Sequence, residues 1–403
     1  MFIKNIVKLV TGTVTAQLLP FFVLPFLTRT MGAENFGIYS LFFTTMVMLG
    51  TLSALRFDYA ITAAKTALQA KLIFILCLVI NVLTLILILI VFLMVISLGY
   101  LSNIWLLLPF AVFLMSINQS YYFYANTKGE FGVMASSRVI NAVVCALAQF
   151  LLVVVLDYSS GAFLGLLVGF ALSTLYLHFK VSLTSSGIKT NRLIFIFKRY
   201  INYPKLVFPG TFINFLSGNM PIYVIGFLFG AAQAGYYSLA IRVAGIPTTM
   251  VGRSVGEVYR LTASKELKSI GNFRSIFIKV ASISLVISIL GFSILFFFAQ
   301  PLFEIVFGKG WDNAAFYTQI LIPMFILQFA TAPVSYSLML SNWQRRELDW
   351  QVFRLALISC LFICAYIFNS DLITYVVFSS FALFSSFLLY FYLCFKSSKT
   401  DER

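Results

Sequence analysis

Long apolar runs alternate with short polar stretches along nearly the whole chain. Each run has about the 17 to 25 residues that an α-helix needs to cross a bilayer. The pattern predicts twelve transmembrane helices, at residues 6–30, 36–57, 72–98, 103–125, 133–156, 160–181, 206–229, 234–252, 276–300, 313–341, 352–368 and 371–395. Most of the 403 residues fall within these runs and the segments between them are short, so no room remains for a separate soluble domain.

Composition supports the same class of protein. Hydrophobic residues make up 61% of the chain and charged residues only 10%, whereas a globular domain is about 25% charged. The five cysteines lie in apolar segments without CxxC spacing, so we expect them to pack as small residues and expect no disulfide, metal or cofactor. The N-terminal run lacks a small-residue cleavage site, so it is interpreted as a retained first helix.

The distribution of basic residues predicts the orientation. The net charge of +15 would suggest nucleic acid in a soluble protein, but in a membrane protein it is interpreted loop by loop, and no nucleic-acid partner is expected. With both termini in the cytoplasm, 25 of the 28 Lys and Arg residues fall on the cytoplasmic side. Arg29 and Lys309 fall on the opposite side, and Arg242 lies within a helix. The chain is thus expected to cross its membrane many times.

An internal repeat relates the two halves. The segment TRTMGAENFGIYSL at residues 28–41 returns as FLFGAAQAGYYSL at residues 227–239. At an offset of 198 the identical pairs are Gly32 and Gly230, Ala33 and Ala231, Gly37 and Gly235, Tyr39 and Tyr237, Ser40 and Ser238, and Leu41 and Leu239. The first predicted helix therefore matches the seventh. Because six helices separate them, the halves are expected to run in the same direction through the membrane.

The expected fold is therefore an all-α polytopic membrane protein with twelve transmembrane helices in two parallel six-helix lobes around a central cavity. The expected lobes are residues 1–181 and 206–396, with a basic cytoplasmic linker at 182–205 and a cytoplasmic tail at 397–403. Helix breaks at matching places favour a gated pair of lobes. The candidate breaks are Pro20, Pro25, Gly218 and Pro221, although Pro and Gly are also common in membrane helices.

Several segments together carry a family resemblance. LPFLTRTMGAENFGIYSL, its echo FGAAQAGYYSLA and the later FEIVFGKGWDNAA resemble the polysaccharide flippases of Gram-negative bacteria. These are O-antigen translocases of the multidrug/oligosaccharidyl-lipid/polysaccharide exporter superfamily. The resemblance implies a flippase that moves an undecaprenyl-diphosphate-linked glycan from the cytoplasmic to the periplasmic leaflet through a cationic cavity. It also points to membrane lipids, polysaccharide polymerase and chain-length machinery as partners.

Arg242 is the sharpest candidate for substrate binding. It lies about eight residues into the predicted helix 234–252, where an isolated charge costs at least about 2.5 kcal/mol. A guanidinium there can bind a diphosphate through two parallel hydrogen bonds, and the resemblance implies this role. The alternative is a structural Arg that pairs with a carbonyl or a carboxylate.

Other charged residues are expected at the two ends of the path. Arg29, near the periplasmic end of the first helix, is a candidate to receive the head group, or else a snorkelling interfacial residue. Arg56 is a candidate to steer the diphosphate, and Asp58 to pair with a gating cation or bind a coupling proton. Because Arg56 and Asp58 lie two residues apart on one predicted helix, they are expected to make separate contacts. The alternative is that both simply anchor the end of this helix. Arg253 offers a basic entrance in the second half.

Polar residues inside the helices complete the candidate set. Asn118, Gln119, Asn214 and Asn219 are candidates to bind sugar hydroxyls, with hydrogen bonding between helices as the alternative. The chain contains no Walker loop, so coupling to an ion gradient is favoured over ATP.

Two other classes of function stay open at this stage. One is a multidrug or metabolite cation antiporter of the same superfamily, which is expected to need a carboxylate in the middle of a span; none of the acidic residues is placed there. The other is a membrane glycan polymerase or acyltransferase. A polymerase is expected to carry a large periplasmic loop, and an acyltransferase a His within the membrane, so the protein is not expected to be an enzyme.

Overall fold

Across the residues that it describes, 2–181 and 190–399, the computed structural model contains helices and no strands. The side chains of residues 2–18, 190 and 253 lie outside this description. The chain forms two compact units. Unit 1 comprises Met1–Gly32 and Tyr39–Phe212, and unit 2 comprises Ala33–Ile38 and Ile213–Arg403. The finer predicted boundaries of lobes, linker and tail stay predictions.

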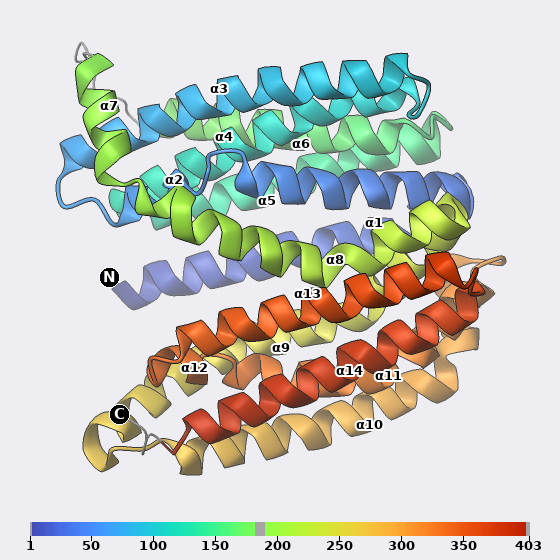
Figure 1. Ribbon diagram of the computed structural model, residues 1–403. Helices are drawn as coiled ribbons and strands as arrows, with labels where there is room; N and C mark the ends of the chain where they lie inside the picture. The colour runs from blue at the N-terminus through green and yellow to red at the C-terminus, as the bar shows by residue number, and fades with distance from the viewer. Residues whose placement is uncertain (1, 182–189, 400–403) are drawn as a thin grey trace. The chain divides into compact units, whose positions relative to one another are not determined.

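Long helices that run side by side make up unit 1 (Figure 1). Two of its elements, η2 and η3, are π-helical, and η1 is a short 3-10 helix. The elements are α1 (Phe2–Leu52), α2 (Phe57–Thr62), α3 (Ala67–Ser97), η1 (Asn103–Leu106), α4 (Leu107–Thr127), α5 (Phe131–Gln149), η2 (Phe150–Val155), α6 (Gly161–Lys180), α7 (Thr190–Arg199) and η3 (Tyr203–Val207).

Unit 2 has the same kind of construction. Within it, α11 packs against α9, α10 and α14, so α11 lies at its centre (Figure 1). The elements are α8 (Phe208–Phe229), which begins in unit 1, α9 (Ala231–Ile270), α10 (Arg274–Phe307), α11 (Asp312–Thr331), η4 (Ala332–Val334), α12 (Ser337–Leu340), α13 (Gln344–Ile367) and α14 (Leu372–Ser397).

These elements account for the twelve predicted helices. Ten helices among the described residues are long and apolar enough to cross a membrane. One of them, α1, carries the first two predicted helices and changes direction at Gly32. The eighth predicted helix lies within α9, which is more polar and is not one of the ten. The protein is thus a multi-pass membrane protein with an all-helical fold.

The internal repeat has a structural counterpart in the backbone. Gly32 has φ 69° and ψ 172°, and its match Gly230 has φ 92° and ψ 168°. A positive φ combined with a ψ near 170° is open essentially only to glycine, so the same residue makes the same break before the second helix of each half. Both breaks are followed by close packing between matched positions in unit 2. A Cβ on Gly37 would lie 1.7 Å from the Ala231 carbonyl oxygen.

The predicted interruptions at proline do not appear as breaks in the helical backbone. Pro20 and Pro25 lie inside α1, in which Gly32 is the one residue with non-helical angles. Pro221 likewise lies inside α8, which continues to Phe229. The chain therefore reverses at a glycine rather than at the prolines, and the gating role of Pro20, Pro25, Gly218 and Pro221 stays a prediction.

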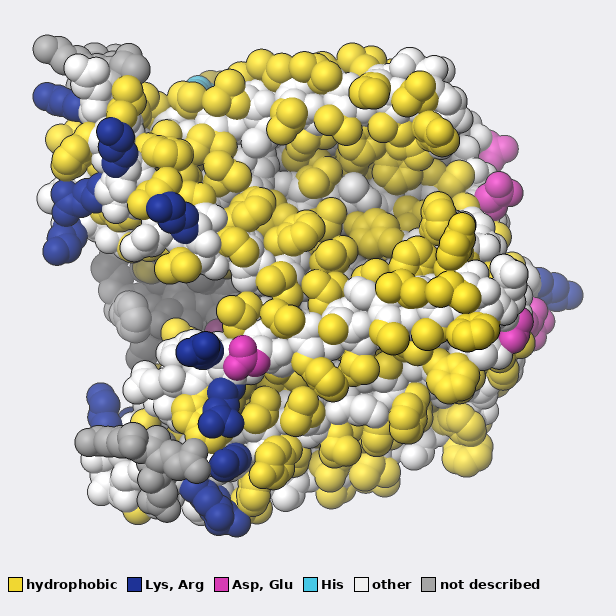
Figure 2. Space-filling model, in the orientation of Figure 1, with side chains coloured by type: hydrophobic (Ala, Val, Ile, Leu, Met, Phe, Trp, Pro, Cys, Tyr) yellow, Lys and Arg dark blue, Asp and Glu magenta, His cyan; other side chains and the backbone are white. Residues whose placement is uncertain are grey.

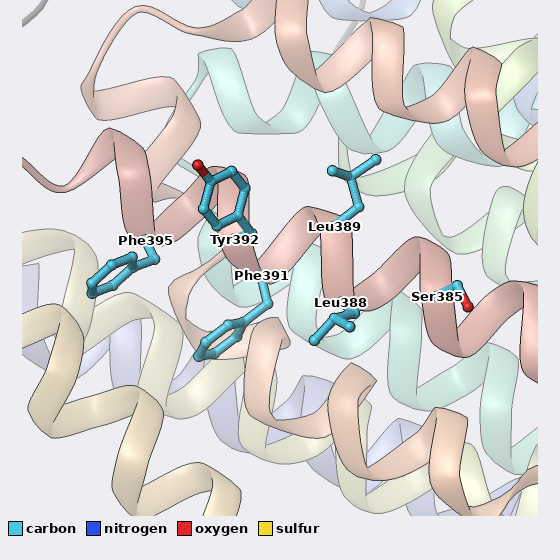
Figure 3. Close-up of a pocket in the computed structure, with 6 residues that line it drawn as sticks. All are labelled: Ser385, Leu388, Leu389, Phe391, Tyr392 and Phe395. Carbon is cyan, nitrogen blue, oxygen red and sulfur yellow. The ribbon is translucent and has the colours of Figure 1, made fainter.

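The visible faces of both units are largely hydrophobic, with most Lys and Arg side chains gathered at one end of each (Figure 2). This is the distribution that a membrane-embedded surface requires. One hollow of about 550 Å³ on unit 2 has described lining residues from α14, namely Ser385, Leu388, Leu389, Phe391, Tyr392 and Phe395 (Figure 3). Its side chains are apolar apart from a serine and a tyrosine hydroxyl, as expected for contact with lipid tails.

Candidate functional site

A buried cluster of charged and polar side chains in unit 1 brings together three of the predicted site residues. After α1 ends at Leu52, Leu55 and Arg56 take left-handed angles, with φ of 49° and 61°. This turn sends the Arg56 side chain back toward α1, where Nη1 donates to the Thr51 carbonyl at 3.1 Å. Arg56 Nη1 also lies 3.5 Å from Asp58 Oδ2, and both residues are at most 3% exposed.

The expectation that Arg56 and Asp58 make separate contacts is therefore wrong. It assumed one continuous helix, in which residues two apart point to different faces. Instead Arg56 precedes the first turn of α2 in a non-helical conformation, and Asp58 lies within that turn. The left-handed turn brings the guanidinium and the carboxylate to the same side.

Gln119 completes this cluster from α4. Its amide Nε2 donates to Asp58 Oδ2, across 61 positions of sequence. The Arg56 guanidinium also lies over the Tyr59 ring, 3.8 Å from its centre, which adds a cation–π contact. Within the described residues, Arg56 Nε and Asp58 Oδ1 are buried and make no hydrogen bond. The cluster thus has one unbonded hydrogen-bond donor, Arg56 Nε, and one unbonded acceptor, Asp58 Oδ1, that another group could engage.

Burial also changes the proton affinity of Asp58, which lies between the candidate spans Leu19–Leu52 and Ala67–Ser97. Removal from water raises the pKa of its carboxyl, against the opposing effects of the Arg56 guanidinium and the Gln119 amide. A carboxyl with a raised pKa takes up a proton more readily than an exposed one. If its cation were drawn away, Asp58 would have a further reason to be protonated.

A second, uncharged network lies under the turn that carries Arg56. Asn81 on α3 is fully buried and accepts hydrogen bonds at Oδ1 from Ser53 at 3.0 Å and Ser116 at 2.7 Å. Ser53 immediately follows α1, so this network fixes the start of the turn against α3 and α4. In the sequence, Asn81 is distinguished only as a polar residue within an apolar run.

Asn118, next to Gln119, faces a different helix. Its Nδ2 donates to Ser173 Oγ at 2.8 Å and to Thr174 Oγ1 at 3.2 Å, both on α6. This is the interhelical hydrogen bonding that the sequence left as the alternative. To bind a sugar, Asn118 would have to exchange its hydrogen bonds to α6 for hydrogen bonds to the sugar.

In unit 2, Arg242 lies on α9 and is partly buried. Its guanidinium carbon is 5.5 Å from the centre of the Phe36 ring, which is itself fully buried and meets Trp311 edge to face. Arg242 is thus placed against an aromatic wall, and its contact with a diphosphate stays a prediction.

Arg354 on α13 is a buried cation that the sequence did not single out. It is 7% exposed, and its Nε and Nη2 donate to Ser217 Oγ at 3.1 Å and 2.6 Å. Nη2 also donates to Asn214 Oδ1 at 3.1 Å. No carboxylate pairs with it among the described residues. Its partners on α8 lie 137 and 140 positions away in the sequence, so no local pattern marked it.

The other candidates are placed as follows. Asn219 donates from Nδ2 to the Phe215 carbonyl of its own helix at 2.9 Å, and Asn214 is engaged by Arg354. Arg29 is exposed, three residues before the break at Gly32. The side chain of Arg253 lies outside the described residues. The structure therefore brings Arg56, Asp58 and Gln119 together in unit 1, and Asn214 together with Arg354 in unit 2.

A polar cavity of about 430 Å³ opens beside Arg354, within unit 2. Its walls come from α8, α9, α11, η4, α13 and α14, and they include Thr248, Gln328, Glu347, Trp350, Gln351 and Tyr390. Glu347 lies in the first turn of α13, inside the candidate span Gln344–Ile367. Glu347 is half-buried there, near the end of the helix rather than in the middle of the span.

The two-unit helical fold is that of known membrane transporters. The chain matches a structure of the lipid II flippase MurJ in an inward closed conformation, with a TM-score of 0.74, 14% sequence identity and coverage of 98% of this chain and 87% of that one. It also matches an inward-facing multidrug resistance MATE family transporter of the MOP superfamily, with a TM-score of 0.71, 12% identity and coverage of 96% of each chain. A MOP superfamily transporter from Pyrococcus furiosus matches at a TM-score of 0.66 and 12% identity, over 99% of this chain and 97% of that one.

The family follows from the sequence. Residues 2–259 match the family described as polysaccharide biosynthesis protein, and the chain belongs to this family. No curated protein matches the sequence. The family and the matched structures are those of transporters and flippases rather than of enzymes.

Proposed function

We propose that the protein is a flippase that translocates an undecaprenyl-diphosphate-linked oligosaccharide, such as an O-antigen repeat unit, from the cytoplasmic to the periplasmic leaflet of a bacterial inner membrane. The observation that carries the proposal is the buried Arg56–Asp58–Gln119 cluster, in a chain of the polysaccharide biosynthesis family. Both termini are proposed to be cytoplasmic, as the basic residues indicate.

The cluster has the chemistry that a diphosphate substrate requires. Arg56 is paired with one carboxylate, and its Nε has no partner among the described residues. A diphosphate carries more charge than Asp58 and accepts two parallel hydrogen bonds from a guanidinium, so it can compete for Arg56. Asp58, released from its cation in a buried position, would then take up a proton. This exchange links substrate binding to a proton and favours coupling to an ion gradient with alternating access.

The test uses a strain that lacks the protein and accumulates the lipid-linked oligosaccharide. Wild-type protein is expected to restore glycan on the outer leaflet, and Arg56→Gln to leave it on the inner leaflet. The matched control is Lys65→Gln, which removes an exposed charge from the same loop and is expected to restore export. Membrane levels of each variant are measured to separate loss of function from loss of protein. Accumulation on the outer leaflet in the deletion strain would contradict the proposal.

A cation antiporter is the second candidate, because Glu347 lines a cavity near the start of a candidate span and the fold matches a multidrug transporter. Efflux of a cationic dye from a drug-sensitive strain separates the two functions. An antiporter is expected to lower dye accumulation and to lose this activity in Glu347→Gln. A flippase is expected to leave dye accumulation unchanged and to lose glycan export in Arg242→Ala.

A further inference from the structure

The polar cavity beside Arg354 contains side chains whose hydrogen bonding the protein does not use. Thr248 is 4% exposed and lines the cavity, and its buried Oγ1 has no hydrogen-bond partner in the described part of the chain. The side chains of Gln328, Glu347 and Gln351 likewise make no hydrogen bond to the described residues. A buried polar group without a partner costs free energy, so the unsatisfied Thr248 hydroxyl, beside three half-buried polar side chains, points to a ligand.

The charges around the cavity decide which kind of ligand fits. Among the lining residues that the structure describes, Glu347 is the one charged side chain, and its carboxylate disfavours a phosphate. Arg354 is not one of the described lining residues. Its guanidinium donates to Ser217 and Asn214 and lies 4.5 Å from the centre of the Trp350 ring. A metal cation would require several converging oxygen ligands, and the described residues contain no group of three or more His, Cys, Asp or Glu able to hold one.

The remaining lining suits a sugar ring. Two amides, a carboxylate and a hydroxyl offer both donors and acceptors to sugar hydroxyl groups. Phe387 and Tyr390 supply an aromatic wall for the apolar face of the ring, and Tyr390 is held in place by stacking on Trp350 at 4.1 Å. The volume of about 430 Å³ lies within the usual range of small-molecule sites, about 300 to 1,000 Å³.

We propose that this cavity is a saccharide subsite, which receives one uncharged sugar of the lipid-linked glycan while the diphosphate binds elsewhere. The inference rests on the proposed function. It adds that unit 2 recognises the glycan itself, through Thr248, Gln328, Glu347 and Gln351, so that a lipid diphosphate without sugar would bind less tightly.

The test compares two lipids on the purified full-length protein in nanodiscs. One is the lipid-linked oligosaccharide extracted from the deletion strain, and the other is undecaprenyl diphosphate without sugar. Wild-type protein is expected to bind the glycosylated lipid more tightly. Gln351→Leu is expected to lower this preference about tenfold, by removing two hydrogen bonds, and Thr248→Val about threefold. Binding of undecaprenyl diphosphate is expected to stay unchanged in both variants.

Two features keep the test decisive. Thr248→Val removes a hydroxyl that bonds to nothing in the described protein, so the variant is expected to fold normally. The control Thr318→Val removes a buried hydroxyl outside the cavity, one that donates to the Ala314 carbonyl at 2.8 Å, and is expected to keep the full preference. A preference that persists in both Gln351→Leu and Thr248→Val would overturn the subsite.

Other outcomes separate this inference from the function on which it rests. If wild-type protein binds neither lipid, the proposed flippase function fails as well. If both lipids bind equally, the flippase stands and the saccharide subsite is wrong. If sodium chloride stabilises wild-type protein against heat but not Glu347→Gln, while the glycan preference is unchanged in Gln351→Leu, the cavity is a cation site and the proposal is overturned.

Discussion

The two units each bury an arginine, but they satisfy it in different ways. In unit 1, Arg56 is 3% exposed and lies beside the Asp58 carboxylate, so the pair is formally neutral. In unit 2, Arg354 is 7% exposed and donates to a hydroxyl and to an amide oxygen of α8, with no carboxylate partner among the described residues.

The difference indicates different uses for the two cations. The ion pair of unit 1 leaves Arg56 Nε and Asp58 Oδ1 unbonded. Arg56 can therefore exchange Asp58 for an anion, and Asp58 can exchange Arg56 for a proton. Arg354 already donates four hydrogen bonds to Asn214 and Ser217, so it fastens α13 to α8. We therefore expect Arg56 to take part in transport and Arg354 to support the cavity next to it.

The largest expected effect is that of Arg56→Met. It leaves the Asp58 carboxylate buried without its cation, so we expect the free energy of unfolding to fall by about 3 kcal/mol. Unfolding of the purified protein in mixed micelles measures the change. Removal of the exposed Arg29 by Arg29→Met is the control and is expected to change stability by less than about 0.5 kcal/mol. An equally small effect for Arg56→Met would show that the ion pair contributes nothing.

Replacing both members of the pair sharpens this prediction. Arg56→Met combined with Asp58→Leu leaves no buried charge, so the double variant is expected to recover about 2 kcal/mol of the loss. The same unfolding measurement gives the coupling energy between the two residues. Additive losses would mean that the two side chains act independently.

Arg354→Met tests the other half of the comparison. The variant leaves only neutral acceptors behind, and Asn214 is exposed, so the expected loss is smaller, about 1 to 2 kcal/mol. Export of the glycan is expected to decline only as far as the amount of folded protein declines. A loss as large as that of Arg56→Met would remove the distinction between the two cations.

Gln119→Leu affects the pair indirectly. It removes the hydrogen bond to Asp58 Oδ2 and keeps the ion pair, so the expected loss is about 1.5 kcal/mol. Asn118→Leu is the neighbouring comparison, since it removes bonds to neutral hydroxyls on α6. Only Gln119→Leu is expected to change the pH dependence of stability.

The smallest expected effect is that pH dependence. Burial raises the pKa of Asp58 above its ordinary value of 3.8. Between the ordinary and the raised pKa, the folded state therefore binds a proton that the unfolded chain has released. The contribution of Asp58 to the free energy of unfolding is therefore fully present below its ordinary pKa and is lost as the pH rises through the raised pKa. Unfolding measured from pH 4 upward should show wild-type protein losing stability relative to Asp58→Asn. A parallel course for the two proteins would contradict the raised pKa.

The sequence by itself determined the class of protein and its repeated plan. Spanning helices depend on the length and hydropathy of local runs, and the matched breaks at Gly32 and Gly230 depend on the freedom of glycine to adopt a positive φ. Both properties belong to short stretches of chain, so they can be inferred without knowing what packs against what.

Only the tertiary structure decided which polar side chains meet. The adjacent residues Asn118 and Gln119 were assigned one role from the sequence, yet one bonds to α6 and the other to Asp58. Successive residues on a helix point about 100° apart, so the neighbouring elements select their partners. Arg354 meets Ser217 across 137 positions for the same reason. Charge and spacing marked Arg56 and Asp58, but a left-handed turn in the folded chain made them a pair.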